Sequence, residues 1–364
     1  MFVLDSHCDT PSQLKRLRDL GADNETGHVD YPKLIQGNVD ASFFAIYVPA
    51  SMTVEDGYKY ADELIDLVEE SVEDNGYDVR MARSVDEALT NKANGYISIM
   101  LGLENGSPLG DDLRRVKHFY DRGVRYITLC HSRDNQICDS CADGHRWGGL
   151  SQFGREVVAE MNRLGILVDV SHISDESFYD VLEASSCPVV ATHSCCRKVS
   201  NHPRNMTDEM MLALAEKGGV IQINFYPVFL DKSWGDCLDV QQLMDDFDVK
   251  EERFIANPAD SETRRLYEEA GERLLAIERP SYKEVVDHID HAVSIVGWEH
   301  VGIGSDFDGI CVPPIGLENV SKMGIIFEEM RRRGYSEEQI EAIAGKNFLR
   351  VLNQAKSSQI KLNH

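Results

Sequence analysis

The 364-residue chain has no apolar run of the roughly 20 residues that a membrane-spanning helix needs. Basic residues are scarce as well, because 37 Lys and Arg stand against 62 Asp and Glu and leave a formal net charge of −25. Nucleic acids and anionic membrane surfaces attract a basic protein face. The sequence therefore argues against a membrane anchor and against nucleic acid as a partner.

The cysteine pattern argues against a disulfide scaffold, because nine Cys are an odd number in a long chain. Cys138 and Cys141 form a single CxxC pair. A structural zinc site normally needs a second pair of ligands, and only His145 is close in sequence. We therefore expect no zinc there. The adjacent Cys195 and Cys196 are expected to end a strand and to bind no metal.

Targeting signals are also missing. Met1 leads directly into an apolar strand pattern, and no secretory leader precedes it. The polar C-terminus carries no hydrophobic anchor signal. We expect a cytoplasmic protein, and a leader already removed would leave the same pattern.

Short apolar and β-branched runs alternate with amphipathic helical patterns along the whole chain. Ser174 and Thr207 precede two of these helical patterns as expected N-caps. The alternation predicts an α/β fold of the (β/α)8 or TIM barrel type. An open doubly wound sheet is the alternative, but no GxGxxG motif follows the first strand. The eight expected strands are 2–7, 41–48, 95–103, 124–131, 165–172, 187–194, 218–225 and 300–306.

One segment interrupts this rhythm. Residues 227–280 separate the seventh and eighth expected strands and read as a long, acidic, largely helical insertion. We expect it at the barrel mouth or along the barrel side. Helical patterns after strand eight are expected to close the fold, so residues 1–364 are predicted to form a single barrel domain.

Ionisable residues fall at the carboxyl ends of six expected strands, where barrel enzymes place their active sites. His7 and Asp9 share one face of the first strand, because residues two apart in a strand point the same way. A lone His or Asp at such a position is usually structural, but six strands agree here. The remaining members of this set are Glu104, His131, His172, His193, Asp306 and Asp308.

Imidazole and carboxylate ligands in this number suit two divalent metal ions, with zinc first among them. A carboxylate can bridge two metals, and Glu104 is the natural candidate. The strand ends therefore predict a hydrolytic metal site.

These motifs resemble the membrane (renal) dipeptidase family, peptidases of the M19 type within the amidohydrolase superfamily, and the bacterial-type members without an anchor in particular. The resemblance runs from about residue 3 to the closing NFLRVL and covers nearly the whole chain. It is carried by DSHCDTP, GLENG, LCHS, DVSHIS, ATHS, NHPRN and GIGSDFDG, in this order.

The resemblance implies two Zn²⁺ per chain. His7 and Asp9 would bind one ion, His172 and His193 the other, and Glu104 would bridge them. His131 and Arg204 would contact the substrate, with His131 and Asp306 as the catalytic residues.

The implied substrate is a dipeptide with a free C-terminal carboxylate, possibly with a D-residue in second place. Family members are often dimers, so a homodimer is possible. Asp308 is expected to hold local structure, and His202, His288 and His291 to be non-catalytic.

One departure from the family concerns the substrate side chain. Phe229 stands where the family often has a Tyr, with Tyr226 nearby. Another amidohydrolase activity, such as hydrolysis of N-acyl amino acids, stays open as an alternative. A barrel that has lost its chemistry and only binds ligands is a third reading, but every expected ligand is present.

Overall fold

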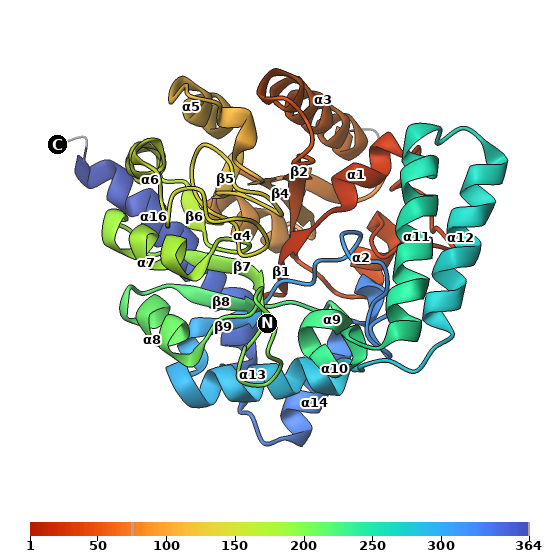
Figure 1. Ribbon diagram of the computed structural model, residues 1–364. Coiled ribbons are helices and arrows are strands. Elements are labelled where there is room, and N and C mark those ends of the chain that lie inside the picture. The colour runs from red at the N-terminus through yellow and green to blue at the C-terminus, as the bar shows by residue number, and fades with distance from the viewer. Residues whose placement is uncertain (74–75, 363–364) are drawn as a thin grey trace.

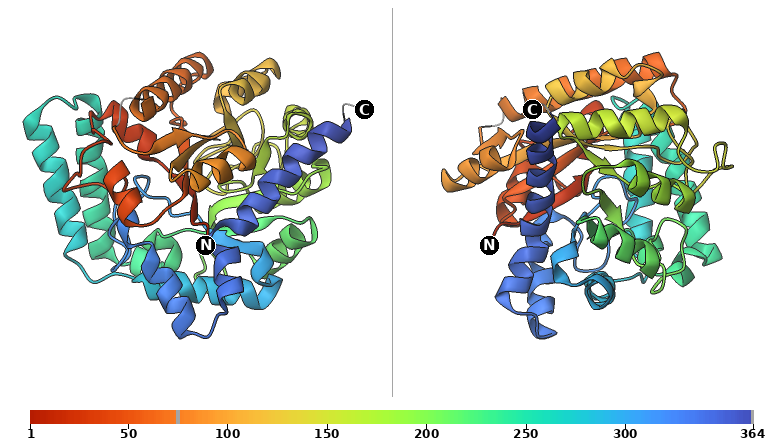
Figure 2. Two further views of the ribbon diagram at one scale, coloured as in Figure 1. Left: turned by 180° about the vertical axis from the view of Figure 1, so that it is seen from behind. Right: turned by 90° about the vertical axis from the view of Figure 1, so that its left-hand side faces the viewer.

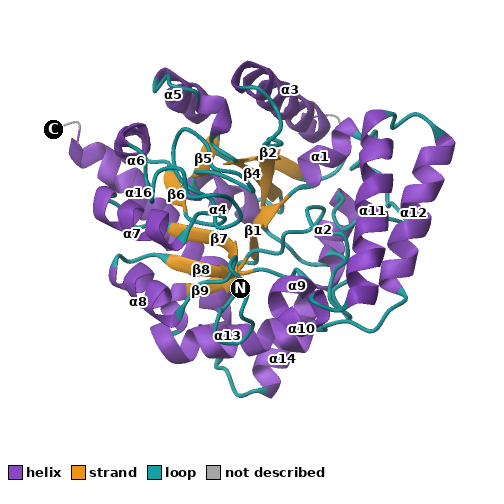
Figure 3. Cartoon of the chain, in the orientation of Figure 1, coloured by secondary structure: helices purple, strands orange, loops and turns teal. Residues whose placement is uncertain are grey.

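The computed structural model describes residues 1–73 and 76–362, and its side chains as far as residue 357. Eight parallel strands form a nearly closed barrel in the order β1-β2-β4-β5-β6-β7-β8-β9, and helices surround it (Figures 1 and 3). The TIM barrel predicted from the sequence is confirmed. The barrel strands are β1 (Leu4–Cys8), β2 (Ala41–Tyr47), β4 (Ile97–Glu104), β5 (Val124–Thr128), β6 (Leu167–Asp169), β7 (Val190–Ser194), β8 (Val220–Ile223) and β9 (Val301–Ile303).

Each of the eight strands overlaps its expected segment; six lie inside it, and β1 and β4 each end one residue later, at Cys8 and Glu104. The structure adds one short strand that the sequence did not predict, β3 (Val79–Met81), which pairs with β4 outside the barrel. Only Val79 of its three residues is fully buried, so it leaves almost no hydrophobic pattern. The barrel strands are apolar on both faces because helices cover the outside and side chains fill the inside.

The barrel closes between β9 and β1, directly beneath the expected metal ligands. The amide of Asp9 donates to the carbonyl of Phe307 at 2.8 Å, and the amide of Asp306 donates to the carbonyl of His7 at 3.0 Å. The two chain segments that carry His7, Asp9 and Asp306 are thus hydrogen-bonded to each other.

The helices follow the strands as the sequence indicates, and both expected N-caps are present. The Ser174 side chain accepts from the amide of Ser177, and Thr207 accepts from that of Met210. The covering helices are α1 (Thr10–Lys15), α2 (Tyr31–Gln36), α3 (Val54–Glu73), α4 (Val85–Ala93), α5 (Arg114–Asp121), α6 (Gln152–Leu164), α7 (Asp175–Ala184), α8 (Asp208–Glu216), α13 (Tyr282–Val296), α14 (Gly324–Arg332), α15 (Glu337–Glu341) and α16 (Asn347–Leu362), with short turns η1 (Ser107–Leu109), η2 (Trp298–His300), η3 (Val320–Lys322) and η4 (Ala342–Lys346).

The amino-terminal end of the barrel is closed by α16, which runs across it (Figure 2). Phe348 and Leu352 of this helix pack with Phe2, Leu4 and other residues of the barrel floor. The opposite end, where the strands finish, is left to loops.

The predicted insertion is helical and lies along one side of the barrel. It consists of α9 (Pro227–Leu230), α10 (Lys232–Gly235), α11 (Leu238–Ala256) and α12 (Ser261–Leu275). The last two form a hairpin at the edge of the molecule, beside α1 and α2 (Figure 1). An ion pair between Arg16 and Glu251, at 2.8 Å, joins the hairpin to the segment after α1.

Among the described residues, no helix is both long enough and apolar enough to cross a membrane.

Candidate active site

The carboxyl ends of six barrel strands bring the expected ionisable residues together. His7 and His193 lie within β1 and β7, and Glu104 is the last residue of β4. The other three come from the loops that directly follow β5, β6 and β9, and they are His131, His172 and Asp306. Strand ends of a parallel barrel point to one face, and this face gathers residues that are up to 299 positions apart, from His7 to Asp306.

Glu104 is at the centre of the cluster, and its two carboxylate oxygens face different partners. Its Oε2 lies 3.5 Å from His7 Nε2. Its Oε1 lies 3.1 Å from His172 Nε2 and 3.5 Å from His193 Nε2. Asp9 lies on the side of His7, with its Oδ2 3.5 Å from the same Nε2. The Glu104 carboxylate therefore lies between two sets of possible ligands, His7 with Asp9 on one side and His172 with His193 on the other.

The donor atoms fit divalent metal ions. Three groups of residues each bring their ligand atoms within 4.8 Å of one another, and Glu104 belongs to two of them. His7 Nε2 is buried and has no hydrogen-bond partner among the described residues, as expected of a nitrogen whose lone pair is meant for a metal. The three groups are His7–Glu104–His193, Glu104–His131–His172 and His7–Asp9–Asp306.

Residues behind the histidines fix the orientation of their rings. His7 Nδ1 is hydrogen-bonded to the Tyr126 hydroxyl at 2.8 Å. Thr192 Oγ1 donates to Asp169 at 2.7 Å and therefore accepts from His193 Nδ1 at 2.9 Å. These bonds leave Nε2 of each ring turned to Glu104. Such second-layer partners are typical of metal-ligating histidines.

Burial and neighbouring negative charge raise the pKa values of two carboxyl groups of the cluster, Asp9 and Asp306. Burial and the charge of Glu104 raise the pKa of Asp9 to about 7. Burial and the charge of Asp9 raise the pKa of Asp306 to about 6. Burial lowers the pKa of His172 and of His193 well below the usual value. A cation placed among these groups would favour ionised carboxylates and neutral imidazoles, which are the forms that bind metal.

The three residues expected to act on the substrate surround the cluster. Arg204 is 8% exposed, and its Nη2 donates to the His193 carbonyl at 3.1 Å. Its Nε is buried and has no hydrogen-bond partner among the residues that the structure describes. The His131 ring packs against that of His172, with centroids 4.1 Å apart. Asp306 Oδ2 accepts from Asn224 Nδ2 at 2.8 Å.

Asp308 makes different contacts from Asp306. Its carboxylate accepts from Arg18 at 2.7 Å, from Thr10 at 2.9 Å and from the amide of His28 at 3.0 Å. These bonds are those of a side chain that joins loops, in agreement with the role expected from the sequence. Phe229, the departure from the family pattern, packs against the Arg204 guanidinium. The guanidinium carbon lies 5.2 Å from the centroid of the Phe229 ring.

The histidines read as non-catalytic have contacts of their own. His288 accepts from the amide of Cys196 at 3.0 Å, and His291 lies 2.7 Å from Asp208. His202 Nδ1 accepts from the Arg204 amide at 3.2 Å. In the part of the chain that the structure describes, Cys138, Cys141 and His145 belong to no group of candidate metal ligands.

Several residues of the site were not found by sequence reasoning. Tyr126 and Asn224 are polar residues in or next to strands that otherwise read as buried core. Gly309 was missed as well, although a Cβ there would lie 2.1 Å from Asp9 Oδ2, so only glycine fits. His172 and Asp306 have left-handed backbones with φ of 71° and 63°, conformations that a non-glycine residue seldom adopts outside a functional site.

Comparisons with known proteins agree with this geometry. The family model for membrane dipeptidase (peptidase family M19) matches residues 1–364. An uncharacterized dipeptidase of Schizosaccharomyces pombe is 31% identical and covers 99% of this chain and 82% of its own length. The probable dipeptidase PvdM from Pseudomonas aeruginosa superposes with a TM-score of 0.81 at 27% identity, covering 98% of this chain and 96% of that one.

A second solved structure was determined with a ligand. It is a metallo peptidase from Rhodobacter sphaeroides liganded with a phosphinate mimic of the dipeptide L-Ala-D-Ala. It superposes with a TM-score of 0.80 at 25% identity and covers 98% of this chain and 99% of that chain.

Proposed function

The chain belongs to the membrane dipeptidase family, peptidase family M19, and is thus a metal-dependent dipeptidase; on this premise we propose that it uses two zinc ions to cleave dipeptides with a free C-terminal carboxylate. The observation that carries the proposal is the position of Glu104. Its two oxygens face His7 on one side and His172 with His193 on the other. A single carboxylate placed in this way suits a bridge between two metals.

The proposed ligands divide into two sets around that bridge. His7 and Asp9, 3.5 Å apart, would hold one ion, and His172 and His193, whose Nε2 atoms lie 2.8 Å apart, would hold the other. The mixture of imidazole nitrogens and carboxylate oxygens is one that zinc accepts. Bound ions of this kind lower the pKa of a coordinated water and polarise a carbonyl group.

The surrounding residues perform the remaining chemistry. Asp306 takes the proton of the attacking water and passes it to the leaving amine. It suits this role because its carboxylate is held in place by the side-chain amide of Asn224, which is a neutral donor. His131 donates a hydrogen bond to the carbonyl oxygen as negative charge develops on it. Its ring is fixed between His172 and Tyr47, with centroid distances of 4.1 and 4.9 Å.

Arg204 selects the substrate by its free carboxylate. A guanidinium binds a carboxylate through parallel hydrogen bonds, and the Nε of Arg204 has no hydrogen-bond partner within the described part of the chain. Contact with Phe229 and the His193 carbonyl holds the group in place. The clamp restricts the substrate to a short peptide that ends next to the scissile bond.

We expect the second residue of the substrate to include D-amino acids. The support is the Rhodobacter sphaeroides relative, whose ligand mimics L-Ala-D-Ala. A cytoplasmic location and a homodimer remain predictions, as does the single-domain organisation.

Amine release from a panel of L-L and L-D dipeptides and matched N-acetyl amino acids tests the proposal on zinc-loaded protein. We expect dipeptide cleavage that a chelator abolishes. Cleavage of the N-acetyl compounds alone would replace the proposal by an N-acyl amino acid hydrolase. Two bound metals without turnover of any compound would contradict catalysis altogether.

A further inference from the structure

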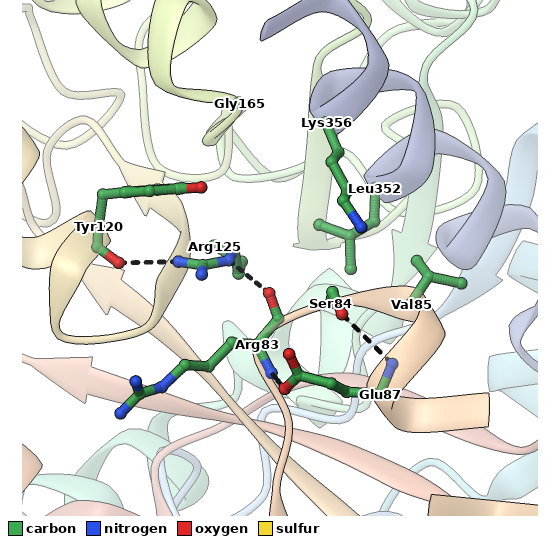
Figure 4. Close-up of a pocket in the computed structure, with 9 residues that line it drawn as sticks. All are labelled: Arg83, Ser84, Val85, Glu87, Tyr120, Arg125, Gly165, Leu352 and Lys356. Atoms are coloured by element: carbon green, nitrogen blue, oxygen red, sulfur yellow. Dashed lines mark hydrogen bonds between the residues drawn. The ribbon is translucent and has the colours of Figure 1, made fainter. Parts of the chain in front are cut away.

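A cavity lies at the edge of the barrel floor, at the end of the barrel opposite the expected metal ligands. Its volume is about 270 Å³. The start of α4, the end of α5, the start of β5, the α6–β6 turn and α16 enclose it (Figure 4). The dipeptidase reaction does not use this end of the barrel, so the cavity needs its own explanation.

Arg125 is at the centre of this cavity and has no carboxylate partner within ion-pair distance in the described parts of the chain. Its Nε donates to the Arg83 carbonyl at 2.6 Å and its Nη1 to the Tyr120 carbonyl at 2.9 Å. The Tyr120 ring covers its face, with the guanidinium carbon 4.3 Å from the ring centroid. The guanidinium is therefore held rigidly, and Nη2 makes no hydrogen bond within the described residues.

An unneutralised guanidinium in a sheltered position is unfavourable, since a partly buried charge is stable only when it is paired. Burial and the nearby charge of Arg83 lower the pKa of Arg125, in keeping with this cost. The nearest acidic residue of the lining, Glu87, already accepts from the Arg83 amide at 2.8 Å. An anion from solution would supply the missing partner.

Two further cations line the same cavity. Lys356 extends from α16 toward Ser84, and Arg83 also belongs to the lining, although its guanidinium points away from Lys356 (Figure 4). Both have surface ion pairs, Lys356 with Asp86 and Arg83 with Glu69, at 2.8 and 3.1 Å. Exposed ion pairs of this kind contribute little to stability, so the two cations can give up these partners for another anion. Three cations around one hollow stand out in a chain with a net charge of −25.

From this arrangement we propose that the cavity is a binding site for a small organic anion that carries one carboxylate or one phosphate group. The anionic group meets Arg125 Nη2 and the Lys356 ammonium. The rest of the ligand packs on the apolar side chains of the lining, Val85 and Leu352. The size of the cavity is at the lower end for ligand sites, so the ligand has about the size of an amino acid or a small phosphate ester.

The ligand would add a charged link between two parts of the chain that already pack together through apolar side chains. Arg125 belongs to the barrel and Lys356 to α16, so an anion between them ties the closing helix to the barrel floor. Binding to the folded state alone raises the melting temperature in proportion to the logarithm of ligand concentration above Kd.

Thermal unfolding of the zinc-loaded protein tests the site, with glycerol phosphate and with acetate as probes at constant ionic strength. We expect Tm to rise with the logarithm of probe concentration above an apparent Kd, with one or both probes. A response to glycerol phosphate alone assigns a phosphate-bearing ligand, and a response to acetate alone assigns a carboxylate.

Variants separate this site from the metal centre, which also binds anions. Arg125→Gln should raise the apparent Kd of the probe at least tenfold. Lys356→Gln, at an exposed position, should raise it less and keeps the test valid if Arg125→Gln fails to fold. Arg204→Ala removes the anion clamp at the metal centre, so the Tm response that persists in this variant belongs to the cavity. Arg114→Gln, on the surface, should leave the response unchanged. The proposal is overturned if neither probe raises Tm beyond the effect of ionic strength, or if Arg125→Gln and Lys356→Gln respond like the unchanged protein.

Discussion

At the residue scale, Arg204 determines which end of a peptide the site accepts. Replacing it with Ala removes the charge-assisted hydrogen bonds to the substrate carboxylate, and a loss of this kind weakens binding about 10- to 100-fold. We expect Arg204→Ala to raise KM by that factor and to leave the metal content unchanged. Steady-state kinetics together with metal analysis measure both. Arg204→Lys keeps the charge without the planar fork and should fall between the two proteins.

A substrate without the carboxylate supplies the control for Arg204. The unchanged enzyme should cleave a dipeptide amide poorly, and Arg204→Ala should cleave the amide and the free acid at similar rates. Equal cleavage of both compounds by the unchanged enzyme would contradict the clamp.

Asp306 and Asp308 are two residues apart, yet their contacts predict opposite effects. Asp306→Asn keeps the shape of the side chain but cannot accept a proton, so we expect kcat to fall by about 10²- to 10⁴-fold with two metals still bound. Asp308→Asn weakens the contacts with Arg18 and His28 and should lower the melting temperature instead. Kinetics, metal analysis and thermal unfolding of the two variants make the comparison. Turnover of Asp306→Asn close to that of the unchanged enzyme would remove Asp306 as the proton carrier.

Tyr126 tests whether the layer behind the ligands matters for metal binding. Its hydroxyl is the hydrogen-bond partner of His7 Nδ1, and such partners typically account for 10- to 100-fold in metal affinity. We expect Tyr126→Phe to lose about that factor, measured by competition with a chromogenic chelator, without a change in circular dichroism. Tyr179→Phe, at a 47% exposed position, is the matched control. Equal affinity of all three proteins would show that the hydrogen bond does not support the ligand.

At the element scale, the sequence predicts the strands and the strand-end positions of the expected ligands, because both depend on local sequence patterns. Buried β-branched runs identified every barrel strand, and barrel topology then placed His7, Glu104 and Asp306 at one end. Tyr126 and Asn224 could not be found in this way, because their partners lie far away in sequence and no spacing rule connects them. The short strand β3 and the left-handed backbone of His172 likewise depend on tertiary packing.

Helix α13 gives the element-scale prediction through His288. Its neutral ring accepts from the Cys196 amide and lies 3.1 Å from the Leu230 carbonyl, so it links α13 to the loop after β7 and to α9. Burial lowers its pKa from 6.5 to about 4, against the opposing effects of the hydrogen bond to the Leu230 carbonyl and of the Asp287 charge. The unfolded chain binds a proton below about pH 6.5 and the folded one only below about 4, so stability is full above 6.5 and falls as the pH drops.

Urea unfolding at pH 7 and pH 5 measures this contribution. His288→Gln cannot titrate, so we expect its loss of stability between the two pH values to be smaller by about 2 kcal/mol than that of the unchanged protein. Both proteins are compared at the same metal content, because the other buried histidines then contribute equally. Parallel pH dependences would show that His288 does not resist protonation in the fold.

At the scale of the whole molecule, the metal site connects strands from all sides of the barrel. Its expected ligands come from the end of β1, from β4 and β7, and from the loop after β6. The charge of Glu104 helps to raise the pKa of Asp9, and the charge of Asp9 helps to raise that of Asp306. Removing bound cations therefore restores repulsion between Asp9, Glu104 and Asp306 and cuts the links between strands. We expect chelation to lower the melting temperature by on the order of 5 °C or more, as follows from the loss of a tightly bound ligand.

Calorimetry before and after chelation, and again after zinc is restored, measures this effect. His193→Ala should begin with a lower melting temperature and lose less on chelation, because one ion is already weakly held. Cys141→Ser should behave like the unchanged protein, since the CxxC pair lies outside the described ligand groups. An unchanged melting temperature on chelation, with metal shown to have left, would mean that the barrel is held by packing alone and that the site adds chemistry without stability.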